Sequence, residues 1–165
     1  MPNHLIAIPK SDDGLRRAIG EAHRRYTRLI NFREGWKGHL WQGRFASYVM
    51  DERYLLACVR YIEMNPVRAG LVKKPEQWSW SSASAHMSGN DDKLSKTTPL
   101  LQIPGGRWED FLNVEIREDE IIAMQRHEKT GRPLGSVRFV EGLEKTLGRL
   151  LQPKKAGRKP KNAKK

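Results

Sequence analysis

The sequence predicts an α+β fold in its first half and a small helical unit in its second half. Two short apolar segments, residues 1–9 and 44–50, are typical of strands, and apolar residues at helical spacing follow each of them. After residue 107 only helical spacing is found. The predicted organisation is a strand-helix-strand-helix domain over 1–87, a linker at 88–106, a helical extension at 107–151 and a disordered basic tail at 152–165.

The first strand and helix are predicted from residues 1–31. The run from Leu5 to Ile8 is apolar and closes at Pro9, so we expect a short buried strand there. Asp12 or Asp13 can then cap a helix over residues 14–31. That helix is predicted to be amphipathic, with an apolar stripe of Leu15, Ile19, Ala22, Tyr26 and Leu29.

The face of this helix opposite the apolar stripe is rich in arginine. A guanidinium group forms forked contacts with phosphate oxygens, so a row of arginines favours nucleic-acid binding. The DNA-binding residues predicted on this helix and in the segment after it are Arg16, Arg17, Arg24, Arg25, Arg28 and Arg44.

The second strand and helix are predicted from residues 44–65. Asp51 follows the strand as a helix cap, and Leu55, Cys58, Val59 and Ile62 form the apolar stripe of the helix. Tyr61 and Asn65 lie one turn apart at the edge of that stripe. This spacing fits a nucleophile beside a metal ligand, but taken alone it favours an ordinary boundary tyrosine with a C-terminal asparagine.

The helical extension consists of two helical patterns, Asp119 to Glu128 and Ser136 to Leu151, joined by KTGRPLG. The glycines and the proline of this joint predict a tight turn. Two helices with such a turn fit a DNA-reading helix-turn-helix, and they also fit a plain helical hairpin.

The charge of the chain indicates a polyanionic partner. The formal net charge is +12, and residues 153–165 carry seven Lys or Arg and no acidic residue. Such an excess attracts a phosphate backbone and releases its counterions, although it would also suit an anionic membrane surface. In the tail, the predicted DNA-binding residues are Lys154, Lys155, Arg158 and Lys159.

The cysteine content and the hydropathy limit the classes of site, location and partner that the chain can have. Cys58 is the only cysteine, which excludes a disulfide within the chain and a cysteine-rich zinc site, and predicts a cytoplasmic location. No apolar run approaches the length of a membrane span, so no membrane partner is expected.

Several segments of the first ninety residues resemble the REP-associated tyrosine transposases, which belong to the HUH single-strand transposase superfamily: MPNH, GLRRAIGEAHRRYTRLIN, GHLWQGRFASYVMD, RYIEMNPVRAGLV and WSWSSASAH. The segment HEKTGRPLGSVRFVEGLEKTLGR with a GRKPK tail is similar to the C-terminal extension of one branch. The resemblance implies a ferredoxin-like domain. In the family a strand, a helix and a strand precede MPNH, so it also implies that the N-terminal part of this domain is missing here.

The resemblance further implies a chemistry for three residues. Tyr61 matches the nucleophile that forms a 5′-phosphotyrosyl link with DNA and frees a 3′-OH. His4 and Asn65 match two ligands of a Mg²⁺ or Mn²⁺ ion that polarises the scissile phosphate. Ile6 stands where the family has a second histidine ligand.

Three functions follow as hypotheses. The first is a transposase that cleaves and rejoins single-stranded DNA at hairpin repeats, for which a homodimer is one expected assembly. The second is a catalytically inactive transposase remnant that acts only as a DNA-binding module. The third, supported by charge alone, is an RNA-binding basic protein.

Overall fold

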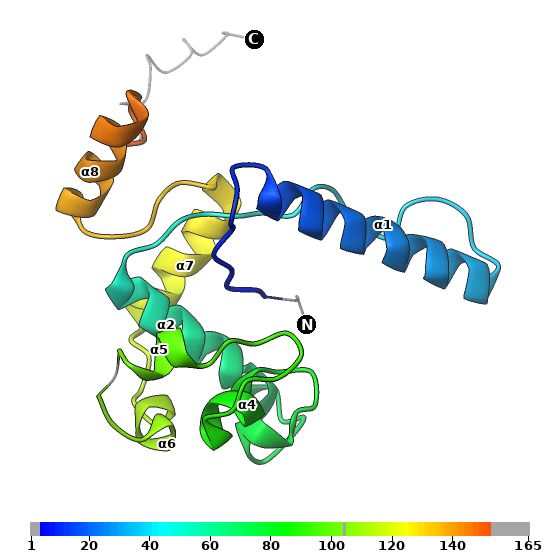
Figure 1. Ribbon diagram of the computed structural model, residues 1–165, viewed down its shortest axis with the longest axis horizontal. Coiled ribbons are helices and arrows are strands. Elements are labelled where there is room, and N and C mark those ends of the chain that lie inside the picture. The colour runs from blue at the N-terminus through cyan, green and yellow to red at the C-terminus, as the bar shows by residue number, and fades with distance from the viewer. Residues whose placement is uncertain (1–3, 104, 153–165) are drawn as a thin grey trace, which may run out of the picture. The chain divides into compact units, whose positions relative to one another are not determined.

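The computed structural model describes residues 4–103 and 105–152, and these residues are mostly helical. The prediction of an α+β, ferredoxin-like fold is therefore wrong for the described part of the chain. The elements, shown in Figure 1, are α1 (Gly14–Glu34), α2 (Glu52–Glu63), α3 (Asn65–Arg68), the 3₁₀ helix η1 (Pro75–Gln77), α4 (Ala83–Ser88), α5 (Thr98–Leu101), α6 (Trp108–Leu112), α7 (Glu118–Thr130) and α8 (Val137–Leu147).

Neither predicted strand forms in the described residues. Residues 4–9 adopt no regular structure, and Ile8, which was expected to be buried, is 87% exposed. In residues 44–50 the only strand-like pairing is a single bridge between Met50 and Leu134. A strand is stable only when a neighbour accepts its ladder of hydrogen bonds, and neither segment has such a neighbour among the described residues.

The contacts divide the chain into two compact units, and the division falls after Ser47. Unit 1 denotes residues 1–47 and unit 2 denotes residues 48–165. The predicted domain bounds at 87 and 107 stay predictions. Within the predicted linker, residues 88–106, the structure contains the short helix α5.

In unit 1, the segment before α1 is followed by the helix itself and then by a loop, residues 35–47, that runs back along the helix (Figure 1). Gly35 ends the helix with a φ of 66°, a left-handed conformation that glycine adopts without strain. The loop is fastened by Trp41. Its ring stacks on His23 at a centroid distance of 3.9 Å, and its Nε1 donates a hydrogen bond of 3.0 Å to Thr27 Oγ1.

The contacts of Trp41 displace the apolar stripe that the sequence predicted for α1. Trp41 packs on His23 and Thr27, and its ring centroid lies 5.8 Å from that of Tyr26, which stays half exposed. Leu29 is exposed as well. Ile30 is the buried residue of this helix. The prediction that Leu29 belongs to a core face is therefore wrong, and Tyr26 is only partly covered, by Trp41.

Unit 2 is built around α2, which packs against α6 and α7. Asp51 caps α2 as predicted, because its Oδ1 accepts a hydrogen bond of 3.1 Å from the backbone N–H of Tyr54. The buried residues at the centre of the unit are Ala57, Cys58, Val59, Trp108, Leu112 and Met124.

A buried carboxyl group joins three helices of unit 2. Glu63, only 1% exposed, lies at the end of α2. Its Oε1 accepts a hydrogen bond of 2.7 Å from Ser82 and lies 2.6 Å from Nδ1 of His86 on α4, and its Oε2 accepts one of 2.8 Å from Trp108 Nε1 on α6. A buried polar group is tolerated only when it is hydrogen-bonded, and Glu63 meets that condition.

Asp51 also connects α2 to the turn that joins α7 and α8. Its Oδ2 accepts a hydrogen bond of 2.8 Å from Ser136 N, and its own N–H donates one of 3.0 Å to Leu134 O. A Cβ at Gly135 would lie 2.8 Å from this Oδ2, so only glycine fits between the turn and the cap of α2. α7 and α8 match the two helical patterns predicted for the extension.

No helix in the described ranges combines the length and the apolar composition needed to cross a membrane.

Candidate nucleic-acid interface and nucleophile site

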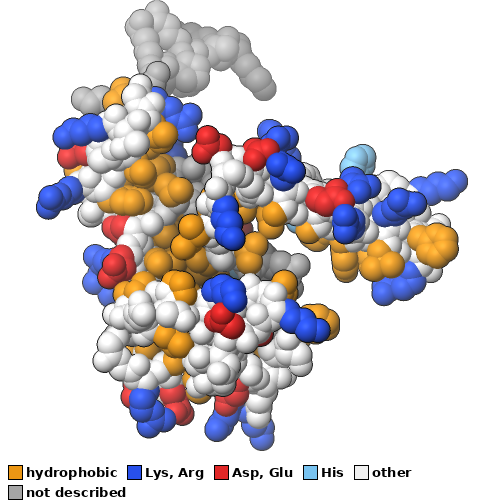
Figure 2. Space-filling view, viewed as in Figure 1, with side chains coloured by type: hydrophobic (Ala, Val, Ile, Leu, Met, Phe, Trp, Pro, Cys, Tyr) orange, Lys and Arg blue, Asp and Glu red, His pale blue; other side chains and the backbone are white. Residues whose placement is uncertain are grey.

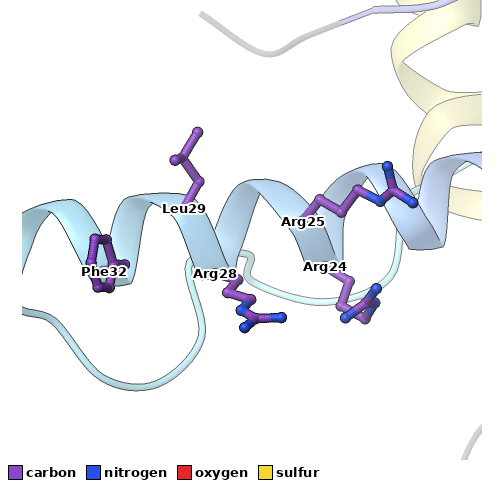
Figure 3. A pocket seen from close by; sticks show the side chains of 5 residues that line it. All are labelled: Arg24, Arg25, Arg28, Leu29 and Phe32. Carbon is purple, nitrogen blue, oxygen red and sulfur yellow. The ribbon is translucent and has the colours of Figure 1, made fainter.

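The first candidate site is the basic surface of α1. The helix carries six arginines and two glutamates, and Figure 2 shows hydrophobic side chains between the Lys and Arg side chains along it. An open depression on this surface is lined by Arg24, Arg25, Arg28, Leu29 and Phe32. In Figure 3, Arg24 and Arg28 extend to one edge of the helix, whereas Arg25 and Leu29 extend to the other. The structure thus brings together three of the predicted DNA-binding arginines.

The apolar residues of this depression are accessible to a ligand. Phe32 is 88% exposed, and Leu29 is also exposed. Trp36, which follows the Gly35 that ends α1, is a further exposed aromatic residue. A large apolar side chain among cations is a recurring feature of surfaces that bind single-stranded nucleic acid.

The arginines of unit 1 differ in how far acidic neighbours neutralise them. Arg24 and Arg25 share Glu21, with contacts of 2.7 to 2.8 Å. The side-chain hydrogen bonds from Arg24 and then Arg25 lower the pKa of Glu21 to about 2, so its charge is permanent at neutral pH. Arg17 lies 3.7 Å from Asp13. The predicted arginines with no acidic or hydrogen-bonded partner among the described residues are Arg16, Arg28 and Arg44.

The second candidate site surrounds Tyr61 at the end of α2. Asn65 begins α3, and Met64 separates that helix from α2. Arg68 joins them: its Nη2 donates hydrogen bonds of 2.9 Å to the Tyr61 carbonyl oxygen and to Asn65 Oδ1. Its guanidinium carbon lies 4.3 Å from the centroid of the Tyr61 ring. Tyr61, Asn65 and Arg68 therefore form one cluster, which we call the Tyr61 cluster.

Two other tyrosines of unit 2 are less suited to act as a nucleophile. Burial, followed by the nearby Cys58, Glu128 and Tyr61, raises the pKa of Tyr48 to about 12, which disfavours the reactive phenolate. Tyr54 lies in the first turn of α2 with the guanidinium carbon of Arg53 at 5.5 Å from its ring centroid. Arg53 also forms an ion pair with Glu120, which offsets its charge.

The predicted metal ligands are divided between the two units of the chain. His4 belongs to unit 1, whereas Tyr61 and Asn65 belong to unit 2. Asn65 Oδ1 already accepts a hydrogen bond from Arg68, and a guanidinium at that position repels a divalent cation. In the described part of the chain, no three His, Cys, Asp or Glu side chains are grouped to hold a metal. Asn65, bonded to Arg68 as it is here, does not fit a divalent ion, and the Mg²⁺ or Mn²⁺ site stays a prediction.

The sequence analysis missed two residues of these sites. Arg68 follows Asn65 by three residues, a spacing that places side chains together on a helix, so it was within reach of the same reasoning. Phe32 had no such signal, because its exposure depends on how the loop packs on α1. The tail residues Lys154, Lys155, Arg158 and Lys159 lie outside the described residues.

Comparison with known proteins leaves the transposase resemblance as a prediction. Neither the protein-family models nor the curated proteins nor the solved structures contain a match to this chain.

Proposed function

We propose that the chain binds single-stranded DNA through the basic and apolar surface of α1. The observation that supports this function most directly is the depression in which Arg24, Arg25 and Arg28 surround the exposed Leu29 and Phe32. The resemblance to single-strand transposases selects hairpin-forming DNA as the form of the ligand.

The mixed character of the surface favours a single strand over a duplex. Arginines contact phosphates in either form, but an exposed phenyl ring gains energy only from a base whose face is accessible. In a duplex the base faces are stacked on one another. Because Phe32 projects from the same depression as three arginines, one strand can place its phosphates and its bases on α1 together.

Fluorescence polarisation with a labelled DNA hairpin that has single-stranded flanks tests this function. We expect the wild-type chain to prefer this hairpin to a blunt duplex and to structured RNA of equal length. Arg24, Arg25 and Arg28 changed together to Ala should weaken binding at least tenfold, because three phosphate contacts are lost. The matched control changes the exposed cations Lys73, Lys74 and Arg107 of unit 2 to Ala. An equal loss of DNA affinity in both variants would mean that binding depends on net charge alone, which contradicts the proposal. A preference for RNA over the DNA hairpin would favour the RNA-binding hypothesis.

A variant with the opposite expected effect sharpens the test. Glu21→Gln removes the carboxylate that holds Arg24 and Arg25, so both guanidinium groups become available to phosphate. We expect tighter binding than in the wild type. Unchanged affinity would mean that these two arginines do not contact the strand.

A second candidate function is cleavage of the bound strand by Tyr61, and the Arg68 guanidinium over its ring favours it. In this reaction the Tyr61 oxygen bonds to phosphorus, and the bond from phosphorus to the 3′ oxygen breaks. The phenol releases its proton, and the departing 3′ oxygen takes one up to give a 3′-OH. A Tyr61→Phe variant that still forms a covalent adduct with DNA would eliminate this function, whereas Tyr54→Phe should retain the adduct.

The proposed location is the cytoplasm and the proposed assembly includes a homodimer. Cys58 is buried, which raises the pKa of its thiol to about 11 and suits a free cysteine in a reducing compartment. Light scattering of the full chain with and without DNA tests the assembly, and a monomer in both conditions would contradict it.

A further inference from the structure

The geometry points to Arg68 as a phosphate-binding residue beside Tyr61. The inference rests on the proposed single-stranded DNA ligand, and it adds a second contact site for that ligand in unit 2. The chemical group recognised is one non-bridging phosphate oxygen of a phosphodiester.

The hydrogen bonds of Arg68 leave part of its guanidinium available. A guanidinium has five N–H donors. Nη2 uses its two on the Tyr61 carbonyl oxygen and Asn65 Oδ1. Nε and Nη1 donate to none of the residues that the structure describes, so three donors remain for a ligand.

Arg68 is both accessible and fixed in position. It is exposed at the end of α3, so a DNA strand can reach it. The two hydrogen bonds and the contact with the Tyr61 ring together define the orientation of the planar group. An arginine held in place in this way binds phosphate with less entropic loss than a free surface side chain.

The full positive charge of Arg68 distinguishes it from the other cations near tyrosines. The structure gives Arg68 no acidic partner among the described residues, whereas Arg53 over Tyr54 is paired with Glu120. A phosphate bound by the remaining donors of Arg68 lies next to Tyr61. If Tyr61 attacks that phosphate, the charge that develops on the phosphorane oxygens is stabilised by a preorganised donor.

Nuclear magnetic resonance of the arginine Nε–H groups in the full chain tests the binding step without requiring cleavage. The probes are an oligothymidylate and its methylphosphonate analogue, which has uncharged linkages. The Arg68 signal, assigned with Arg68→Lys, should shift with the phosphodiester and not with the methylphosphonate, whereas the Arg53 signal should not move. An unmoved Arg68 signal while the α1 arginine signals shift overturns the inference and leaves the proposed function intact. If no arginine signal shifts, both are overturned.

Single-turnover adduct formation supplies the second measurement if the wild-type chain cleaves DNA. At saturating DNA, Arg68→Gln should slow the adduct about 100-fold to 1000-fold, as for the loss of one preorganised donor. The rate of adduct formation in Arg68→Lys should lie between those of the wild type and Arg68→Gln. The rate in the control Arg53→Gln should stay within about threefold of the wild type. Thermal melting of each variant separates this effect from unfolding. A wild-type rate in a folded Arg68→Gln variant overturns the inference.

Discussion

At the scale of single residues, the stability of unit 2 depends on the Glu63 carboxyl. It satisfies Ser82, His86 and Trp108, which come from segments distant in sequence. Removing the shared carboxyl leaves the buried side chains of His86 and Trp108 without this partner, which costs more than the hydrogen bonds themselves contribute.

We therefore expect Glu63→Ala to lower the free energy of unfolding by roughly 3 kcal/mol or more. Glu63→Gln keeps the volume and one acceptor oxygen, so its cost should be smaller. Urea denaturation followed by circular dichroism measures both. The control is Glu52→Ala on the same helix, where the side chain is exposed. A Glu63→Ala variant as stable as Glu52→Ala would contradict the buried network.

Two weak acids of unit 2, the buried Cys58 and the half-buried Tyr48, predict a loss of stability at alkaline pH. Burial raises the pKa of Cys58 from 9.0 to about 11, and burial with nearby charges raises that of Tyr48 from 10.0 to about 12. The folded chain thus holds these protons more tightly than the unfolded chain does. Their contribution to stability is complete below pH 9 and is lost as the pH rises towards 12.

Urea midpoints measured from pH 8 to pH 12 should therefore fall for the wild type. The fall should be smaller for a variant that combines Tyr48→Phe with Cys58→Ala. Tyr26→Phe is the control, since this tyrosine is half exposed. The same pH dependence in all three proteins would show that neither group titrates differently on unfolding.

At the scale of elements, α1 owes its proposed function to a face that the returning loop does not cover. Trp41 occupies the side formed by His23 and Thr27, and this leaves Leu29 and Phe32 exposed among arginines. An exposed ring contributes little to folding, so its removal isolates its role in binding.

Phe32→Ala should weaken binding of a single-stranded oligonucleotide by about 1–3 kcal/mol, the loss of one stacked base. Its melting temperature should match the wild type, because the ring is 88% exposed. Fluorescence polarisation measures the affinity. Leu94→Ala, which removes another exposed side chain, should leave affinity unaltered. A melting temperature that drops with the affinity would instead place Phe32 in a packed contact.

The helices could be predicted from the sequence to a larger extent than the sites. Helical spacing and the Asp51 cap were sufficient for α1, α2, α7 and α8, because these signals are local. The prediction of strands was wrong because an apolar run such as residues 4–9 forms a strand only beside a partner strand. The presence of a partner cannot be seen in the local sequence. The position of Arg68 over Tyr61 depends on how α3 follows α2, which the sequence alone does not define.

At the scale of the whole molecule, binding should depend strongly on salt, since the net charge is +12. Deleting residues 153–165 removes seven positive charges. If all seven contact a single strand, the slope of log affinity against log salt should flatten by about 5, and partial contact gives less. The slope is obtained from affinities measured at salt concentrations from about 50 to about 300 mM. An unaltered slope would show that the tail does not contact the DNA.

The proposal that α1 contacts the bases of a single strand is tested most directly by photocrosslinking. The full chain is irradiated with a hairpin whose single-stranded flank carries 5-iodouracil, and the crosslinked peptides are identified by mass spectrometry. We predict crosslinks at Phe32, with Tyr26 and Trp36 as the neighbouring exposed aromatic residues. Crosslinks confined to unit 2, or a pattern unchanged by Phe32→Ala, would contradict the assignment of DNA binding to this helix.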